Sequence, residues 1–215
     1  MWLLTLIDFI LHIDQHLSLL VQNYDEWIYL ILFVIVFCET GLIITPFLPG
    51  DSLIFAAASI ATIGGMNIYL LWGILVIAAI VGDAVNFSIG KYFGEMIPFH
   101  NPDSKIFKQK YLIQTQTFYE KHGGKTIVIA RFIPIIRTFT PFIAGMGQMN
   151  YSQFFLYNIV GALLWVTIFC LLGYFFGNTE IVQNNLSLIL IVIILISLLP
   201  VIITFIKNRL SKYHG

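Results

Sequence analysis

Four ionisable side chains stand within or beside apolar stretches of this sequence: Glu39, Asp51, Arg131 and Arg137. A single Asp, Lys or Arg at the centre of a lipid bilayer costs about 2.5–3.5 kcal/mol. Four such groups without partners would therefore cost on the order of 10 kcal/mol. We expect the four side chains to face a shared cavity and one another instead of lipid.

The two arginines have the chemistry of an anion site. A guanidinium group presents a fork of N–H donors that matches phosphate oxygens, and it stays protonated under physiological conditions. Helices that begin after Pro49 and at Pro134 would add backbone N–H donors aimed at an anion. We therefore predict that Arg131 and Arg137 bind the charged group of a substrate.

The carboxylates have the chemistry of proton coupling. Removal from water favours the neutral form of a carboxyl group, whereas a neighbouring guanidinium favours its charged form. A group held between these two effects can take up and release a proton, so Glu39 and Asp51 are candidates for this step. Asp83 follows Gly82 in another apolar stretch. It either joins the pair or forms a hydrogen bond with a neighbouring helix.

A second interpretation of these charges stays open at this point. The acids and arginines could form buried ion pairs that only lock segments of the chain together. Arg131 could also extend its charged end to the membrane interface along an apolar stem.

Composition indicates that water is not the only solvent of this chain. Of its 215 residues 59% are hydrophobic and only 10% are charged, against roughly a quarter charged in an ordinary globular protein. This length allows a handful of membrane crossings, and we expect one membrane domain. Cys38 and Cys170 lie in apolar stretches, where small buried residues are expected. We find no nucleophile-and-base set or metal-ligand cluster in the broken segments, and expect no enzyme, metal or cofactor.

The first half of the chain divides into three predicted segments. Residues 1–24 resemble an amphipathic helix on the membrane surface, and a span follows from Trp27 to about residue 44. Pro46, Pro49 and Gly50 end that span. The next 14 apolar residues are too short to cross about 30 Å of hydrocarbon. We therefore predict that residues 46–65 enter and leave the membrane on the same side.

The second half begins after a long span at residues 68–94 and a polar, lysine-rich loop at 95–125. Residues 126–149 contain both arginines and are interrupted by Pro134 and Pro141, so we predict a second re-entrant segment. Gly145 could allow close packing or act as a hinge. A span at 154–177 and a last crossing at 186–206 complete the layout.

The distribution of basic residues predicts the orientation. No Lys or Arg precedes Lys91, whereas six lie between Lys91 and Lys125. Because basic loops stay in the cytoplasm, the 95–125 loop and both termini are expected to be cytoplasmic. The first re-entrant segment would then enter from the external face and the second from the cytoplasmic face.

Short matches between the two halves predict an internal repeat over residues 27–94 and 126–177. The sequence FLP at 47–49 matches FIP at 132–134, MN at 66–67 matches MN at 149–150, and GKYFG at 90–94 matches GYFFG at 173–177. Chance similarity between apolar stretches is the alternative. The predicted fold class is an all-α membrane protein with two oppositely oriented re-entrant hairpins, an inverted repeat typical of transporters.

Three motifs resemble the DedA family, also called the SNARE-associated or VTT-domain family. They are ETGLIITPFLPGD at 39–51, GDAVNFSIGKYFG at 82–94, and the stretch at 118–154 that contains ARFIPIIRTFTPFIAG. The resemblance implies a bacterial inner-membrane protein linked to the recycling of undecaprenyl phosphate and dependent on the proton motive force. It also implies that the acidic pair Glu39 and Asp51 and the arginine pair Arg131 and Arg137 are needed for activity. Asn86-Phe87 departs from an aromatic-rich pattern common in the family.

The residues and the resemblance together predict a transporter that flips a phosphate-bearing lipid carrier, undecaprenyl phosphate by the resemblance. A proton-coupled small-cation antiporter and a general phospholipid scramblase are the alternatives. We expect membrane lipids and protons as partners and no nucleic acid. The sequence leaves open whether the chain forms a homo-oligomer.

Overall fold

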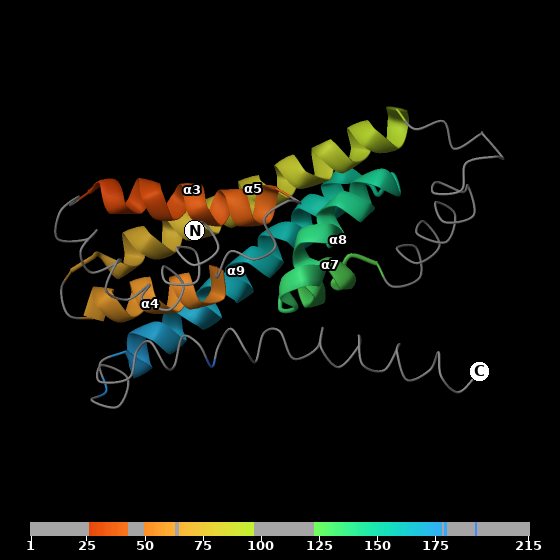
Figure 1. Ribbon diagram of the computed structural model, residues 1–215. Coiled ribbons are helices and arrows are strands. Elements are labelled where there is room, and N and C mark those ends of the chain that lie inside the picture. The colour runs from red at the N-terminus through yellow and green to blue at the C-terminus, as the bar shows by residue number, and fades with distance from the viewer. Residues whose placement is uncertain are drawn as a thin grey trace, which may run out of the picture. The chain divides into compact units, whose positions relative to one another are not determined.

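The computed structural model describes residues 26–42, 50–62, 65–96, 123–177, 179 and 192 of the chain. These residues form helices and no strand, which confirms the all-α class (Figure 1). The helices are α3 (Trp27–Gly41), α4 (Gly50–Thr62), α5 (Ile68–Met96), α7 (Lys125–Ala130), α8 (Pro134–Met146) and α9 (Tyr151–Phe176). The predicted 1–24 helix, Pro46, Pro49, most of the 95–125 loop and all but one residue of the 186–206 crossing lie outside the described residues.

Two of the described helices are long and apolar enough to cross a membrane. They are α5 over Ile68–Gly94 and α9 over Tyr151–Phe176. At 1.5 Å per residue α5 is about 43 Å long, against about 30 Å of bilayer hydrocarbon. Exposed tyrosines stand near both ends of α5, at Tyr69 and Tyr92, about 35 Å apart along its axis. Aromatic residues gather at this spacing where a helix meets the two interfaces of a bilayer.

The helices expose many large apolar side chains and bury several polar or charged ones within an otherwise apolar core. On α5, Asp83 and Asn86 are buried, and on α8, Arg137 and Thr138 are buried. The exposed residues of the same two helices include large apolar ones: Ile77, Val81, Val85, Ile136, Phe139 and Ile143. Water-soluble proteins bury their apolar residues and expose their charged ones. Large exposed apolar residues beside buried charged ones therefore indicate an outer surface that faces lipid.

The chain divides into two compact units. The first unit contains the start of α3, all of α4, the start of α5 and the end of α9. The second unit contains the end of α3, most of α5, α7, α8 and the first part of α9.

In the first unit, α4 packs closely against the end of α9. A Cβ atom at Gly173 would collide with the carbonyl oxygen of Phe55, and one at Gly177 would collide with Ser59. Asn67 caps the start of α5, because its Oδ1 accepts hydrogen bonds from the backbone N–H of Tyr69 and of the next residue.

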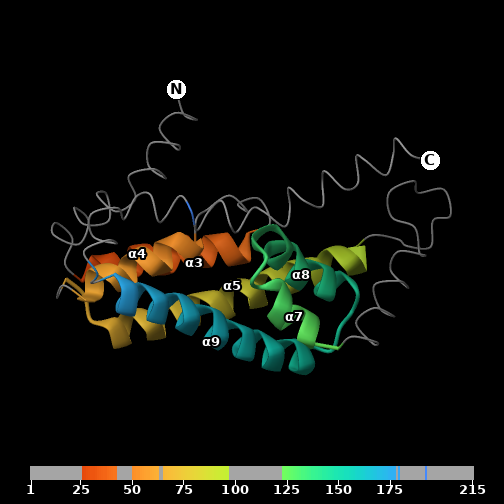
Figure 2. The ribbon, with the colours of Figure 1, turned by 90° about the horizontal axis from the view of Figure 1, so that it is seen from below.

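The second unit repeats these local features with α8 in place of α4. The end of α5 lies along α8, where a Cβ at Gly90 would collide with the Phe142 carbonyl and one at Gly94 would come within 3.0 Å of the Met146 backbone (Figures 1 and 2). Asn150 caps α9 through hydrogen bonds to its Oδ1. The short helices α4 and α8 each have 13 residues. Residues that match in the two halves of the sequence therefore have matching local roles.

Both Pro134 and Pro141 were predicted to break the helix in residues 126–149, but the structure has a break only at Pro134. Residues 131–133 separate α7 from α8, and Pro134 is the first residue of α8, where its missing N–H is not needed. The expectation that Pro141 also breaks the segment is wrong, because α8 continues through it to Met146. Pro141 deprives the Arg137 carbonyl of one helical hydrogen bond, and the burial of Pro141 and Ala144 favours continuation of the helix.

Alanine substitutions at two glycines of α5 test whether α5 and α8 pack closely. Gly90→Ala should push α8 away from α5 and cost about 1–3 kcal/mol, because the new methyl group meets backbone and not a movable side chain. Gly73→Ala is the matched control, since nothing lies within 4 Å of the added atom. We expect a lower thermal unfolding midpoint in detergent for the first variant only. Equal midpoints for both variants would contradict the packing described.

Candidate functional site

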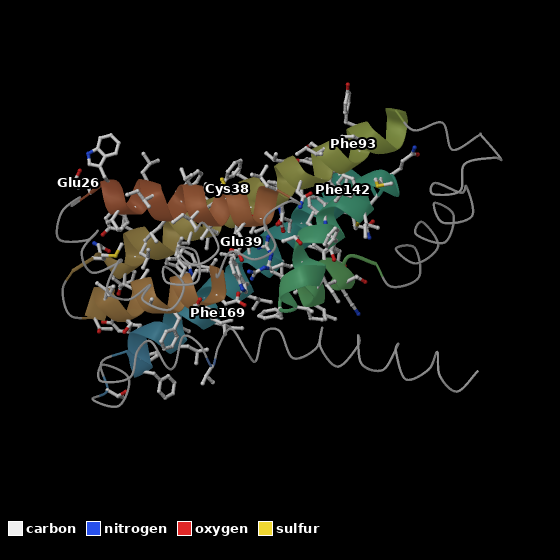
Figure 3. The ribbon with its side chains drawn as sticks, in the orientation of Figure 1. Glu26, Cys38, Glu39, Phe93, Phe142 and Phe169 are labelled. Atoms are coloured by element: carbon white, nitrogen blue, oxygen red, sulfur yellow. The ribbon has the colours of Figure 1, made fainter. Side chains whose placement is uncertain are left out.

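An ion pair joins the end of α3 to the start of α8 in the second unit. Glu39 is fully buried near the end of α3, on the face that turns toward α8 (Figure 3). Arg137 lies in the first turn of α8, and its Nη2 donates to a carboxylate oxygen of Glu39. The backbones come close here, because a Cβ at Gly82 of α5 would collide with Thr40 Oγ1. Glycine at position 82 therefore lets the end of α3 approach α5.

A second ion pair joins the break after α7 to the middle of α5. Arg131 directly follows α7, and its Nη2 donates to the carboxylate of Asp83. The same nitrogen lies 3.2 Å from the carbonyl oxygen of Ala79, one helical turn before Asp83. The Arg131 side chain is 3% exposed. The interpretation in which Arg131 extends to the interface is therefore wrong, and both arginines form buried ion pairs.

One tryptophan of α9 packs against both guanidinium groups. The Cζ atom of Arg137 lies 4.9 Å from the centre of the Trp165 ring, and that of Arg131 lies 5.9 Å from it. Trp165 is fully buried. A desolvated cation over a tryptophan face gains on the order of 2 kcal/mol. The ring therefore stabilises positive charge at this place in addition to the carboxylates.

Two asparagines hold the backbone around the ion pairs. Asn86 Nδ2 donates to the carbonyl oxygens of Thr40 at 3.0 Å and Thr138 at 2.7 Å, the residues that follow Glu39 and Arg137. Asn158 of α9 accepts a hydrogen bond from Arg131 at 3.0 Å and donates to the Ile80 carbonyl at 2.9 Å. Each ion pair is thus positioned by one amide side chain. We call these seven residues the ion-pair network: Glu39, Asp83, Asn86, Arg131, Arg137, Asn158 and Trp165.

The ion-pair network has no net charge. It nevertheless contains polar atoms that could bind a ligand. Its two carboxylates balance its two guanidinium groups. Arg131 Nη1 and Asn86 Oδ1 are buried, and neither has a hydrogen-bond partner among the residues that the structure describes. A buried polar atom left in this state costs about 1–3 kcal/mol. One donor and one acceptor are therefore available to a polar ligand or to water.

The other predicted residues belong to the first unit, serve helix packing or lie outside the described chain. Asp51 is buried in the first turn of α4, and Gly50 is the first residue of that helix, both in the first unit. Gly145 serves close packing, since a Cβ there would collide with the Phe87 carbonyl. In the part of the chain described, no three His, Cys, Asp or Glu side chains are grouped to hold a metal.

Sequence reasoning did not identify Asn158 and Trp165, and it noted Asn86 without placing it in the site. Asn158 is an amide within a helix of 26 mostly apolar residues, and Trp165 follows it two turns later on the same face. Asn86 follows Asp83 by almost one turn of α5. A search for amide side chains within long apolar helices would therefore have found the two asparagines, but not Trp165.

A double-mutant cycle on Asp83 and Arg131 tests whether the pair is energetically coupled. Asp83→Leu and Arg131→Met should each cost about 3–5 kcal/mol, because each leaves one buried charge without its partner. The double variant has no unpaired charge at positions 83 and 131, so it should recover most of the lost stability. Thermal unfolding in detergent measures all four proteins. Losses that simply add in the double variant would show that the two side chains do not stabilise each other.

Comparison with known proteins agrees with a membrane protein. A VTT domain matches residues 48–175, a range that includes Asp83, Arg131 and Arg137. Protein DedA of Escherichia coli K12 is 57% identical over 206 residues, which cover 95% of this chain and 94% of that protein. An uncharacterized membrane protein of Mycobacterium leprae is 42% identical over 85% of this chain and 78% of its own length. Inner membrane protein YqjA of E. coli K12 is 35% identical over 72% and 70%. No solved structure matches the chain.

Proposed function

The chain belongs to the VTT-domain family, which includes the DedA proteins, and from that premise we propose that it flips a phosphate-bearing lipid across the bacterial inner membrane. The lipid we propose is the carrier undecaprenyl phosphate, and the driving force is the proton motive force. The observation that carries this proposal is the ion-pair network: two guanidinium groups, each paired with a carboxylate, buried in a protein whose surface is apolar.

Charge balance gives a reason for coupling lipid movement to protons. An entering phosphate brings negative charge and several acceptor oxygens, which can replace a carboxylate at an arginine. The displaced carboxylate would then be a buried charge without a partner, a state that costs several kcal/mol. Uptake of one proton by Glu39 or Asp83 removes that cost. Binding of the phosphate and protonation of the acid therefore favour each other.

The atoms available at the network suit the first step of this exchange. Arg131 Nη1 can donate a hydrogen bond to a phosphate oxygen before any ion pair breaks, since it has no hydrogen-bond partner in the described structure. Trp165 lies against both guanidinium groups and stabilises the one whose carboxyl partner has taken up the proton. Asp51 of the first unit is a further candidate for proton transfer, as the family resemblance implies.

We also propose that α4 and the α7–α8 segment are re-entrant hairpins of an inverted repeat, with both termini in the cytoplasm. The 13 residues of α4 and of α8 are each about 20 Å long, too short to cross the hydrocarbon. The matching asparagine caps and glycine contacts of the two units support a repeat. The basic residues that follow α5 support the orientation.

Labelling of single cysteines tests the inverted orientation. Tyr69 and Ser152 are both exposed and occupy corresponding positions, each two residues after a capping asparagine. In Tyr69→Cys and Ser152→Cys proteins whose Cys38 and Cys170 are replaced by Ala, an impermeant maleimide added outside sealed vesicles should label only one of the two. Labelling of both from the same side would contradict the inverted repeat.

Transport in liposomes tests the proposed function. Arg137→Lys keeps the positive charge but loses the planar fork, so we expect undecaprenyl phosphate transport to fall about tenfold or more. Glu39→Gln should abolish the response of transport to a pH gradient, because the glutamine cannot take up a proton. Lys125→Gln, which removes an exposed charge from α7, is the control and should transport normally.

Three results would contradict this function. Unchanged transport by folded Arg137→Lys and Glu39→Gln proteins would remove the roles given to these residues. Proton flux that depends on an added cation and needs no lipid substrate would identify a small-cation antiporter. Equal transport of ordinary phospholipids without any gradient would identify a general scramblase.

A further inference from the structure

Gly161 is a buried residue inside α9, where this helix passes the end of α7 (Figure 2). A glycine inside a helix is less favourable than alanine, because its backbone loses more freedom on folding. Other glycines of the second unit offset this cost by close packing. A Cβ atom at Gly82, Gly90 or Gly145 would come within 2.1 Å of an atom of a neighbouring helix. Each of these three positions therefore requires glycine for packing.

Packing does not require glycine at position 161. The atoms nearest to a Cβ there would be Val128 Cα at 3.5 Å, Arg131 Cδ at 3.6 Å and Arg131 Nε at 3.8 Å. These are ordinary van der Waals distances, so a methyl group would fit without displacing its neighbours. Because glycine has no Cβ, the structure instead has room for one methyl group beside the side chain of Arg131.

Arg131 is held to α5 and α9 through one of its two terminal nitrogens. Nη2 donates to the carboxylate of Asp83, and it lies 3.0 Å from Asn158 Oδ1 and 3.2 Å from the Ala79 carbonyl oxygen. Nη1 is buried and has no hydrogen-bond partner among the residues that the structure describes. Three acceptors thus share one nitrogen, which carries two hydrogens. The guanidinium group is therefore positioned for the Asp83 pair and still has an unused donor for a second anion.

The proposed replacement of Asp83 by a lipid phosphate ends the ion pair that fixes this guanidinium group. The group is joined to the rest of Arg131 through Nε and Cδ, so a turn toward another anion displaces these two atoms. In an interior that is packed as densely as a crystal, such a displacement needs room beside them. The room that Gly161 leaves borders both atoms.

We propose that Gly161 is a positioning residue for lipid transport, because it leaves the room in which the Arg131 guanidinium group turns from Asp83 to the phosphate. The inference rests on the function proposed above. A methyl group at position 161 would contact Cδ and Nε of Arg131 and hold them in the geometry of the ion pair. It would therefore slow the exchange of the headgroup without disturbing the resting structure.

Gly161→Ala tests this role through effects of opposite sign on stability and transport. Alanine favours the helix, so we expect the thermal unfolding midpoint in detergent to rise by about 1–4 °C. Transport of undecaprenyl phosphate in liposomes at saturating lipid should slow about tenfold, equivalent to about 1.4 kcal/mol in the barrier. Binding of this lipid in nanodiscs should stay within about twofold.

Gly73→Ala is the matched control. It makes the same change inside another long helix, at a position where nothing lies within 4 Å of the added atom. It should leave both transport and lipid binding unchanged.

Side-chain NMR observes the movement of Arg131 without relying on transport. The chain has three arginines, Arg131, Arg137 and Arg209, so their Nε–H signals can be assigned by single Lys substitutions. In Gly161→Ala, the Nε–H of Arg131 should exchange with water more slowly than in the unsubstituted protein. The Nε–H of Arg137 should exchange at an unchanged rate.

Four results would overturn the inference while the proposed function stands. A lower unfolding midpoint for Gly161→Ala would show that the glycine serves packing, and unchanged transport would show that the room is not used. Slower transport with unchanged Arg131 exchange would place the effect in the backbone of α9. Weaker lipid binding would place the headgroup itself in this space. If the unsubstituted protein binds undecaprenyl phosphate but does not transport it, the proposed function fails and the inference fails with it.

Discussion

A charge taken out of water needs an opposite charge beside it, and this requirement accounts for most of the second unit. Two guanidinium groups are buried in a protein whose outer faces are apolar, so each arginine needs a carboxylate on a neighbouring helix. The helices can supply these carboxylates only if their backbones come close. Gly82 permits the approach at Thr40, and Gly90 and Gly145 permit it along α8. The glycines thus allow the helices to come close enough for the arginines and carboxylates to pair.

The elements of this fold were largely predictable because their signals are local. Apolar length predicted α5 and the core of α9, and Pro134 predicted the start of α8. The prediction failed at Pro141, because a missing backbone hydrogen bond is a local penalty, whereas the packing that outweighs it involves residues distant in sequence. The matches between the halves predicted equivalent positions, and asparagine caps and glycine contacts are found there.

The sequence predicted most of the charged residues of the site but not which carboxylate pairs with which arginine. Because buried charges are energetically costly, Glu39, Arg131 and Arg137 could be identified from the sequence. Which residues pair depends on how each helix is rotated about its axis, and the sequence does not specify that rotation. Asp83 proved to be the partner of Arg131, although it was a secondary candidate. Trp165 gave no signal, since a tryptophan in an apolar span is ordinary until its ring is found against two cations.

The amide group of Asn86 has a mechanical consequence. Both hydrogens of a single nitrogen are committed to carbonyl oxygens of different helices, one in α3 and one in α8. If these helices separate, one N–H of Asn86 loses its acceptor in a buried interior. Asn86 therefore ties the end of α3 to the start of α8 through one side chain, so any movement that separates these two helices has to break a buried hydrogen bond.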